Sequence, residues 1–262
     1  MNSVKSDLNS SVNASLQDAT TRFSKLRGVL FDKDGTLIDF QRTWGPAIHA
    51  VIHALADGDV EKIRAQAECL HFEIETRRFR ATSPIIGGAT SQYGSAWARA
   101  LGRADFVALR AEIDTLAAAA CIESLTPVGE PAEILRALRA TGLKVGLATN
   151  DAEASARRHL AQLELTELMD FVAGYDSGHG AKPDAGMVLA FAREIHAEPE
   201  QIALVGDSLH DLESARAAGA IAIAVLSGVA SREDLAPHAD YVIADIGELP
   251  ALFAIASRGA PR

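Results

Sequence analysis

Two aspartates separated by one residue follow directly on an apolar segment near the start of the chain. In GVLFDKDGTLIDF, residues 28–40, the apolar run ends at Asp32, and Asp34 comes two positions later. A carboxylate in apolar surroundings is costly unless it is paired or binds a cation. In an extended segment, residues i and i+2 lie on one side of the chain, so one carboxylate could attack phosphorus while the other transfers a proton. The alternative is that the pair only caps a turn.

Further polar residues occur at the ends of two later apolar segments and at the start of a helical pattern. Open parallel sheets bind ligands beyond the carboxyl ends of their strands, so these residues are expected to converge with the two aspartates. Several carboxylates in one crevice repel each other unless a cation is bound, and hard oxygen ligands suit Mg²⁺. Hydroxyl, amide and ammonium groups suit a phosphoryl group. The residues are Thr149 and Asn150 in LKVGLATN, Lys182 in AKPD, and Asp207 and Asp211 in VGDSLHD.

The elements that must position these residues are apolar segments alternating with helical patterns. This alternation predicts an α/β fold whose parallel sheet is covered by helices on both faces. Residues 41–126 interrupt it, because they are rich in helical patterns without a convincing strand, and this predicts an all-helical insertion. The expected division is a disordered tail at 1–24, a core at 25–40 and 127–262, and a helical cap at 41–126. Strands are expected within 27–32, 143–150, 170–176, 201–207, 220–226 and 240–245.

Together the motifs resemble those of the haloacid dehalogenase superfamily, in its phosphatase branch with a helical cap and especially the phosphoglycolate phosphatases. FDKDGTL is similar to the DxDGT nucleophile motif, LATN to the second motif, AKPD to the third and VGDSLHD to the acidic fourth. The resemblance covers roughly residues 27–245. It implies a Rossmann-like sheet with the first strand central and a cap that closes over the site.

The resemblance also implies roles for the acidic residues. Asp32 would be the nucleophile and Asp34 the general acid/base. Mg²⁺ would be held by Asp32, the backbone carbonyl of Asp34, and Asp207, with Asp211 supporting the metal site from the same acidic motif.

For the phosphoryl group, the resemblance implies that Thr149 and Lys182 hold its oxygens and that Asn150 contributes through its backbone. Lys33 lies between the two aspartates, and its side chain is expected on the opposite side of the chain. No catalytic role is therefore expected for Lys33.

The function expected from the resemblance is hydrolysis of a small phosphate monoester, such as phosphoglycolate, with Mg²⁺. Dehalogenases and phosphonate-cleaving relatives lack the second aspartate, so Asp34 argues against both reactions. A sugar phosphomutase, a sugar-phosphate phosphatase and a nucleotide phosphatase stay open as alternatives. A binding or regulatory protein on an inactive scaffold is disfavoured, because the full set of motif residues is present.

Composition limits the partners. The net charge of −10 argues against non-specific binding to nucleic acid. No apolar run is long enough to span a membrane, and the first 24 residues lack the apolar core of a secretory signal. Cys69 and Cys121 fit neither a disulfide framework nor a metal site, which suits a reducing compartment and a cytoplasmic protein. The sequence does not indicate an oligomeric state.

The insertion contains candidates for substrate selection. The Gly-rich segment 82–94 is either a specificity loop or a plain connector. The arginines of ETRRFR, residues 75–80, could clamp a substrate carboxylate, although a solvated helix face is the favoured interpretation. Trp44 and Trp97 are expected to pack inside the cap.

Overall fold

A six-stranded parallel sheet forms the core of the computed structural model, which describes residues 22–86 and 90–258. The strand order is β5-β4-β1-β6-β7-β8, so β1 is central and its carboxyl end lies between those of β4 and β6. Each strand falls within a segment expected from the sequence, and the predicted α/β class with a Rossmann-like sheet is confirmed. The strands are β1 (Gly28–Phe31), β4 (Lys144–Ala148), β5 (Phe171–Ala173), β6 (Ile202–Gly206), β7 (Ile221–Val225) and β8 (Tyr241–Ile243).

Both faces of the sheet are buried, because successive apolar side chains of each strand enter opposite layers. In β1, Val29 and Phe31 enter one hydrophobic cluster, and Leu30 enters the other. The first cluster is covered by α6 (Pro131–Ala140), α7 (Glu153–Gln162) and α11 (Leu249–Arg258). The second is covered by α8 (Gly186–Glu194), α9 (Leu209–Ala218) and the short α10 (Arg232–Leu235).

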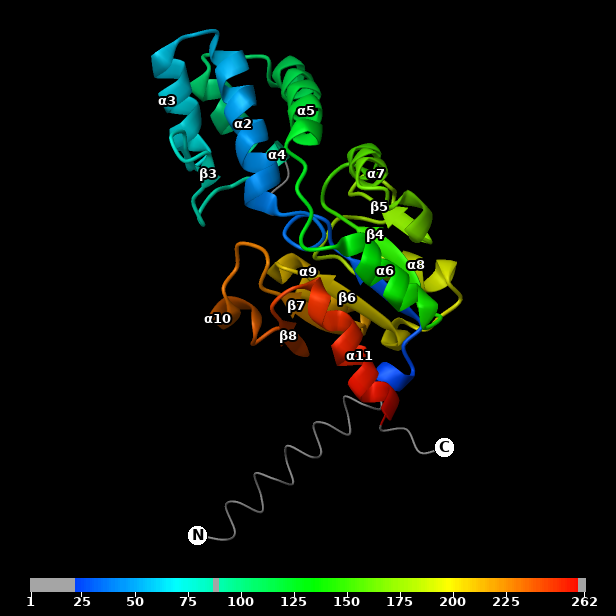
Figure 1. Ribbon diagram of the computed structural model, residues 1–262. Helices are drawn as coiled ribbons and strands as arrows, with labels where there is room; N and C mark the ends of the chain where they lie inside the picture. The colour runs from blue at the N-terminus through cyan, green and yellow to red at the C-terminus, as the bar shows by residue number, and fades with distance from the viewer. Residues whose placement is uncertain (1–21, 87–89, 259–262) are drawn as a thin grey trace.

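The helices between β1 and α6 form a separate unit beyond the carboxyl ends of the strands (Figure 1). It has its own hydrophobic core, in which Trp97 and Leu70 are fully buried. Asp39 caps its first helix by accepting a hydrogen bond from the backbone N–H of Arg42. The helices are α2 (Phe40–Ala56), α3 (Val60–Cys69), α4 (Thr90–Ala100) and α5 (Phe106–Glu123).

The insertion also contains a pair of two-residue antiparallel strands that the sequence did not predict. They are β2 (Phe72–Glu73) and β3 (Arg78–Phe79). Phe72 and Phe79 face each other across the pair with ring centroids 5.0 Å apart. Two residues per strand are too few to produce the alternating pattern by which strands are recognised.

The chain enters and leaves the insertion through two adjacent segments. The backbone N–H of Asp39 donates to the carbonyl of Thr126 at 2.9 Å. The backbone N–H of Thr126 in turn donates to Oγ1 of Thr43 at 3.0 Å. These bonds fix the first turn of α2 against the core.

The expected tail of residues 1–24 lies mostly outside the described residues. Residues 22–24 are described, and Phe23 is buried with its ring centroid 4.7 Å from that of Tyr241. Phe23 therefore belongs to the folded core and not to the expected disordered tail, because its side chain packs on the sheet core. Among the described residues, none of the helices has the length and apolar character needed to cross a membrane.

Candidate active site

A tight loop after β1 presents the two aspartates of the first motif. The carbonyl of Lys33 accepts hydrogen bonds from the backbone N–H groups of Leu37 and Ile38. Gly35 has φ of +86°, and a Cβ atom there would lie 2.3 Å from Oδ2 of Asp207. Only glycine permits both this backbone angle and the close approach of Asp207.

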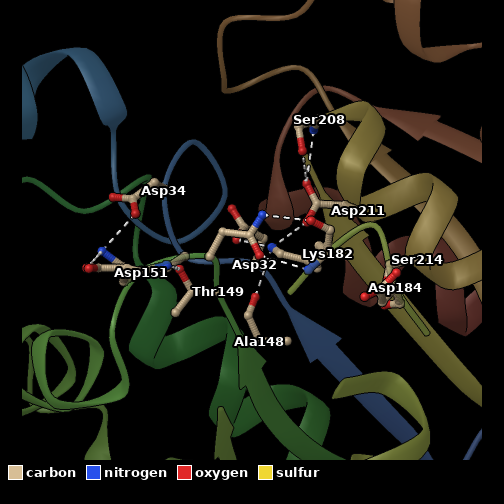
Figure 2. A network of polar contacts seen from close by, with 12 residues as sticks. Asp32, Asp34, Ala148, Thr149, Asp151, Lys182, Asp184, Ser208, Asp211 and Ser214 are labelled. Atoms are coloured by element: carbon tan, nitrogen blue, oxygen red, sulfur yellow. Dashed lines mark hydrogen bonds and ion pairs between the residues drawn. The ribbon is translucent and has the colours of Figure 1, made fainter. Parts of the chain in front are cut away.

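Lys182 holds together the carboxylates of two motifs (Figure 2). Its Nζ donates to Oδ1 of Asp32 and to Oδ1 of Asp211, each at 2.5 Å, and to the carbonyl of Ala148 at 3.0 Å. All three N–H groups of the ammonium therefore have acceptors. Burial alone would lower the pKa of Lys182, but Asp211 and Asp32 outweigh it and raise that pKa.

Asp32, Asp207 and Asp211 form a buried acidic cluster at the carboxyl ends of β1 and β6. One carboxylate oxygen from each lies within 4.8 Å of the others. Burial, partly opposed by Lys182 and reinforced by Asp211 and Asp34, raises the pKa of Asp32 to about 7. The pKa of Asp207 is also raised well above its ordinary value, first by burial and then by the charges of Asp32 and Asp211.

This donor set fits a small divalent cation. Three carboxylates face one ammonium, so two negative charges remain uncompensated when all three carboxylates are ionised. Hard oxygen donors around such an excess of charge are the ligands that Mg²⁺ prefers.

The remaining predicted residues lie in the same region with differing partners. Oγ1 of Thr149 accepts a hydrogen bond from the backbone N–H of Asp151, which leaves its hydroxyl proton available for donation. Oδ1 of Asn150 accepts a hydrogen bond from the backbone N–H of Lys182 at 2.8 Å, and Nδ2 of Asn150 donates to the carbonyl of Lys182 at 3.0 Å. This side chain therefore holds the Lys182 segment in place. Asp211, besides contacting Lys182, accepts from the backbone N–H and hydroxyl of Ser208.

A second buried lysine, Lys33, contacts the other aspartate of the first motif. The expectation that its side chain points away is wrong: Nζ lies 2.7 Å from Oδ2 of Asp34, 2.9 Å from Oδ2 of Asp151 and 3.1 Å from Nδ1 of His159. Asp34 completes its contacts by accepting from Nε1 of Trp44 at 2.6 Å. Figure 2 shows Asp34 directed towards Asp151, in a cluster separate from that of Asp32.

The charges in this second cluster fix the state of His159. An ammonium only donates, so Nδ1 of His159 accepts and the proton of the neutral ring resides on Nε2. Burial first, and then the positive charge of Lys33, lower the pKa of His159 to about 4. Burial alone would raise the pKa of Asp151, but Lys33 outweighs it and lowers that pKa.

Both clusters face a cavity of about 420 Å³ between the sheet and the helical insertion. Trp97 is fully buried in the core of the insertion and Trp44 packs against that core, as expected, and both side chains also line this cavity. Ile85 and Ile86, from the Gly-rich segment, also line it, while Gly87 and Gly88 lie outside the described residues. The described arginines of residues 75–80 are not among its lining residues.

Sequence reasoning missed Lys33, Trp44, Asp151 and His159. The only local signal was the position of Lys33 itself, between two aspartates where the chain enters the core. Asp151 and His159 are 118 and 126 positions from Lys33, so their contact depends on tertiary packing.

Comparison with known proteins gives consistent results. A family model described as haloacid dehalogenase-like hydrolase matches residues 26–219. N-acetylmuramic acid 6-phosphate phosphatase of Pseudomonas aeruginosa is 27% identical over 84% of this chain and 91% of its own length. Phosphoglycolate phosphatase of Salmonella typhimurium is 29% identical over 86% of this chain and 90% of its own length. A HAD family hydrolase of Deinococcus radiodurans, solved with bound phosphate and sodium, shares the fold with a TM-score of 0.65 and 23% identity, over 90% of this chain and 99% of that one.

Proposed function

This chain belongs to the haloacid dehalogenase-like hydrolases, and on that basis we propose that it hydrolyses a small phosphate monoester through a phosphoryl group carried by Asp32. The observation that carries the proposal is the buried contact of Asp32 with Lys182 beside the acidic cluster. Lys182 engages Oδ1 of Asp32, which leaves Oδ2 to face phosphorus. We further propose that residues 25–40 and 127–262 act as the catalytic core and residues 41–126 as the cap.

In the first half-reaction, Oδ2 of Asp32 attacks phosphorus and the bond to the leaving alcohol oxygen breaks. Asp34 donates the proton that the departing oxygen needs. The hydroxyl of Thr149 donates to the phosphoryl oxygens, and the ammonium of Lys182 does so by exchanging one of its three present acceptors for a phosphoryl oxygen. Both act where developing negative charge is greatest.

In the second half-reaction, Asp34 takes a proton from water, whose oxygen attacks phosphorus. The bond to Asp32 then breaks, and phosphate leaves with the original carboxylate restored. The side chains of Asp32 and Asp207 and the backbone carbonyl of Asp34 would hold Mg²⁺, with Asp211 in support. The cation would neutralise charge between Asp32 and the phosphoryl oxygens.

Two classes of substrate have specific support. Phosphoglycolate is the substrate named for the Salmonella typhimurium relative. A sugar phosphate is favoured by the name of the Pseudomonas aeruginosa relative and by Trp44 and Tyr93 on the cap side of the cavity. Aromatic side chains pack against the apolar face of a sugar ring, and 420 Å³ is ample for one.

The test is phosphate release from phosphoglycolate, N-acetylmuramic acid 6-phosphate, glucose phosphates and nucleoside monophosphates, each with Mg²⁺ and with chelator. Metal-dependent release concentrated on one ester supports the proposal and names the substrate. Asp32→Asn is expected to abolish it while the protein remains folded. Conversion of glucose 1-phosphate to its 6-isomer without phosphate release would indicate the phosphomutase instead.

A further inference from the structure

The cavity contains a buried group of contacts around Asp34 that the proposed chemistry does not use. Lys33 is fully buried, and its ammonium has three acceptors: Oδ2 of Asp34, Oδ2 of Asp151 and Nδ1 of His159. An ammonium with three acceptors has no rotational freedom left, so its position is fixed by the core. Oδ2 of Asp34 is thereby held by a rigid partner.

The second oxygen of Asp34 is held from the insertion. Nε1 of Trp44, one turn into α2, donates to Oδ1 of Asp34 at 2.6 Å. The indole also lies over the Lys33 ammonium, with the ring centroid 5.3 Å from Nζ, and meets the His159 ring edge-on at 6.2 Å. Each oxygen of Asp34 therefore has one donor, one from the core and one from the cap.

We propose that Lys33, supported by Asp151 and His159, and Trp44 are positioning residues that orient the Asp34 carboxyl for proton transfer to the leaving oxygen. The inference rests on the proposed phosphatase function. Asp32, Asp34 and Trp44 line the same cavity, and in the proposed reaction the leaving alcohol of an ester whose phosphorus is held at Asp32 extends into it. A carboxyl that turns away from this direction cannot reach the leaving oxygen within hydrogen-bond distance.

This role predicts a dependence on the leaving group. The nitrophenolate of p-nitrophenyl phosphate departs without a proton, whereas the alkoxide of benzyl phosphate needs one. The two esters are similar in size and both are aromatic. A misplaced Asp34 therefore slows alcohol release from benzyl phosphate and leaves release of nitrophenol nearly unchanged.

The experiment measures single-turnover alcohol release from both esters with wild type, Lys33→Met and Trp44→Phe in the presence of Mg²⁺. Single turnover isolates the first half-reaction from the hydrolytic step, which also uses Asp34. For Lys33→Met we expect about a 10²-fold fall for benzyl phosphate, at unchanged half-saturating concentration, and little change for p-nitrophenyl phosphate. Trp44→Phe keeps the ring but removes the donor, and we expect the same selective loss, smaller in size.

Two further variants separate positioning from general damage. Lys33→Met leaves Asp34 and Asp151 without a neighbouring positive charge. Adding Asp151→Asn restores the net charge of the cluster, while the contact of residue 33 with Asp34 stays broken. Arg139→Met is the matched control, because it breaks the ion pair of Arg139 with Asp170 at the opposite end of the strands. We expect the double variant to show the selective loss and Arg139→Met to show none. Melting temperatures confirm that each variant is folded.

The outcomes are distinct. Selective loss on benzyl phosphate in the folded Lys33 variants supports the inference. Equal loss on both esters, no loss, or faster release from benzyl phosphate overturns it while the phosphatase proposal stands. Failure of the wild type to cleave either ester overturns the phosphatase proposal, and the inference with it.

Discussion

The ammonium of Lys182 lies 2.5 Å from Oδ1 of Asp32, although the two residues are 150 positions apart in the sequence. Lys33 makes the corresponding contact with its sequence neighbour Asp34, because its Nζ lies 2.7 Å from Oδ2 of that residue. Each lysine is buried, bridges two carboxylates and donates to a third acceptor. The two aspartates of one motif thus belong to separate charge clusters. Asp32 lies with Lys182 in the acidic cluster, and Asp34 lies with Lys33 and contacts Trp44 of the insertion.

Replacing Lys182 should be severe even before catalysis is considered. Lys182→Met leaves Asp32, Asp207 and Asp211 buried without a cation, and loss of one partner of a buried ion pair typically costs about 3–5 kcal/mol. We expect the free energy of unfolding of the metal-free protein, measured with urea, to fall by this amount and to recover in part with Mg²⁺. We also expect the variant to release no phosphate. Lys144→Met is the control, because its pair with Asp170 has an exposed lysine and is worth about 0–1 kcal/mol. Equal effects of the two variants would contradict the assigned cluster.

Gly35 offers a test of the Asp207 position. Gly35→Ala introduces a Cβ that would lie 2.3 Å from Oδ2 of Asp207, at a φ of +86°. Gly142→Ala imposes a similar backbone strain at +90°, but its Cβ has no neighbour within 4 Å. We expect Gly142→Ala to lose about 1 kcal/mol of unfolding free energy and to keep full activity. We expect Gly35→Ala to lose more stability than this and to bind Mg²⁺ weakly, as measured by calorimetry. Unchanged Mg²⁺ affinity in Gly35→Ala would show that Asp207 is not a ligand.

The raised pKa of Asp32 predicts a stability cost in the metal-free enzyme. Its folded value of about 7 exceeds the ordinary 3.8, so between these values the folded state retains a proton that the unfolded chain releases. Stability therefore falls as pH rises through this window. Asp32→Asn lacks the titration, and we expect it to be the more stable protein at pH 7 without metal, by a few kcal/mol at most.

Saturating Mg²⁺ should make the wild type more stable than Asp32→Asn at pH 7, because the cation interacts with the ionised carboxylate of the wild type. Urea unfolding at pH 4.5 and 7, with Mg²⁺ and with chelator, measures both effects. A wild type that is more stable than Asp32→Asn at pH 7 in chelator would contradict the unfavourable burial of this carboxylate.

The sheet and the convergence of the site could be predicted because they depend on local patterns. Apolar segments mark the strands, and the parallel arrangement brings their carboxyl ends to one edge. The direction of Lys33 could not be obtained this way. Alternation of side chains holds only within a strand, and β1 ends at Phe31, so Lys33 already lies in the turn. Its partners Asp151 and His159 come from a distant helix and loop, and no pattern near residue 33 indicates them.

His159 should make stability fall as the pH drops. Its pKa in the folded protein is about 4, against an ordinary 6.5, so between pH 6.5 and 4 the unfolded chain takes up a proton that the folded protein refuses. The stabilisation is complete above pH 6.5 and is lost progressively towards pH 4, amounting to up to about 3 kcal/mol.

His159→Gln keeps an oxygen that can accept from Lys33 but does not titrate. We expect the difference in unfolding free energy between wild type and His159→Gln to shrink across this window. A difference that is constant from pH 7 to pH 4 would mean that His159 accepts a proton in the folded protein, which is incompatible with Nδ1 accepting from the Lys33 ammonium.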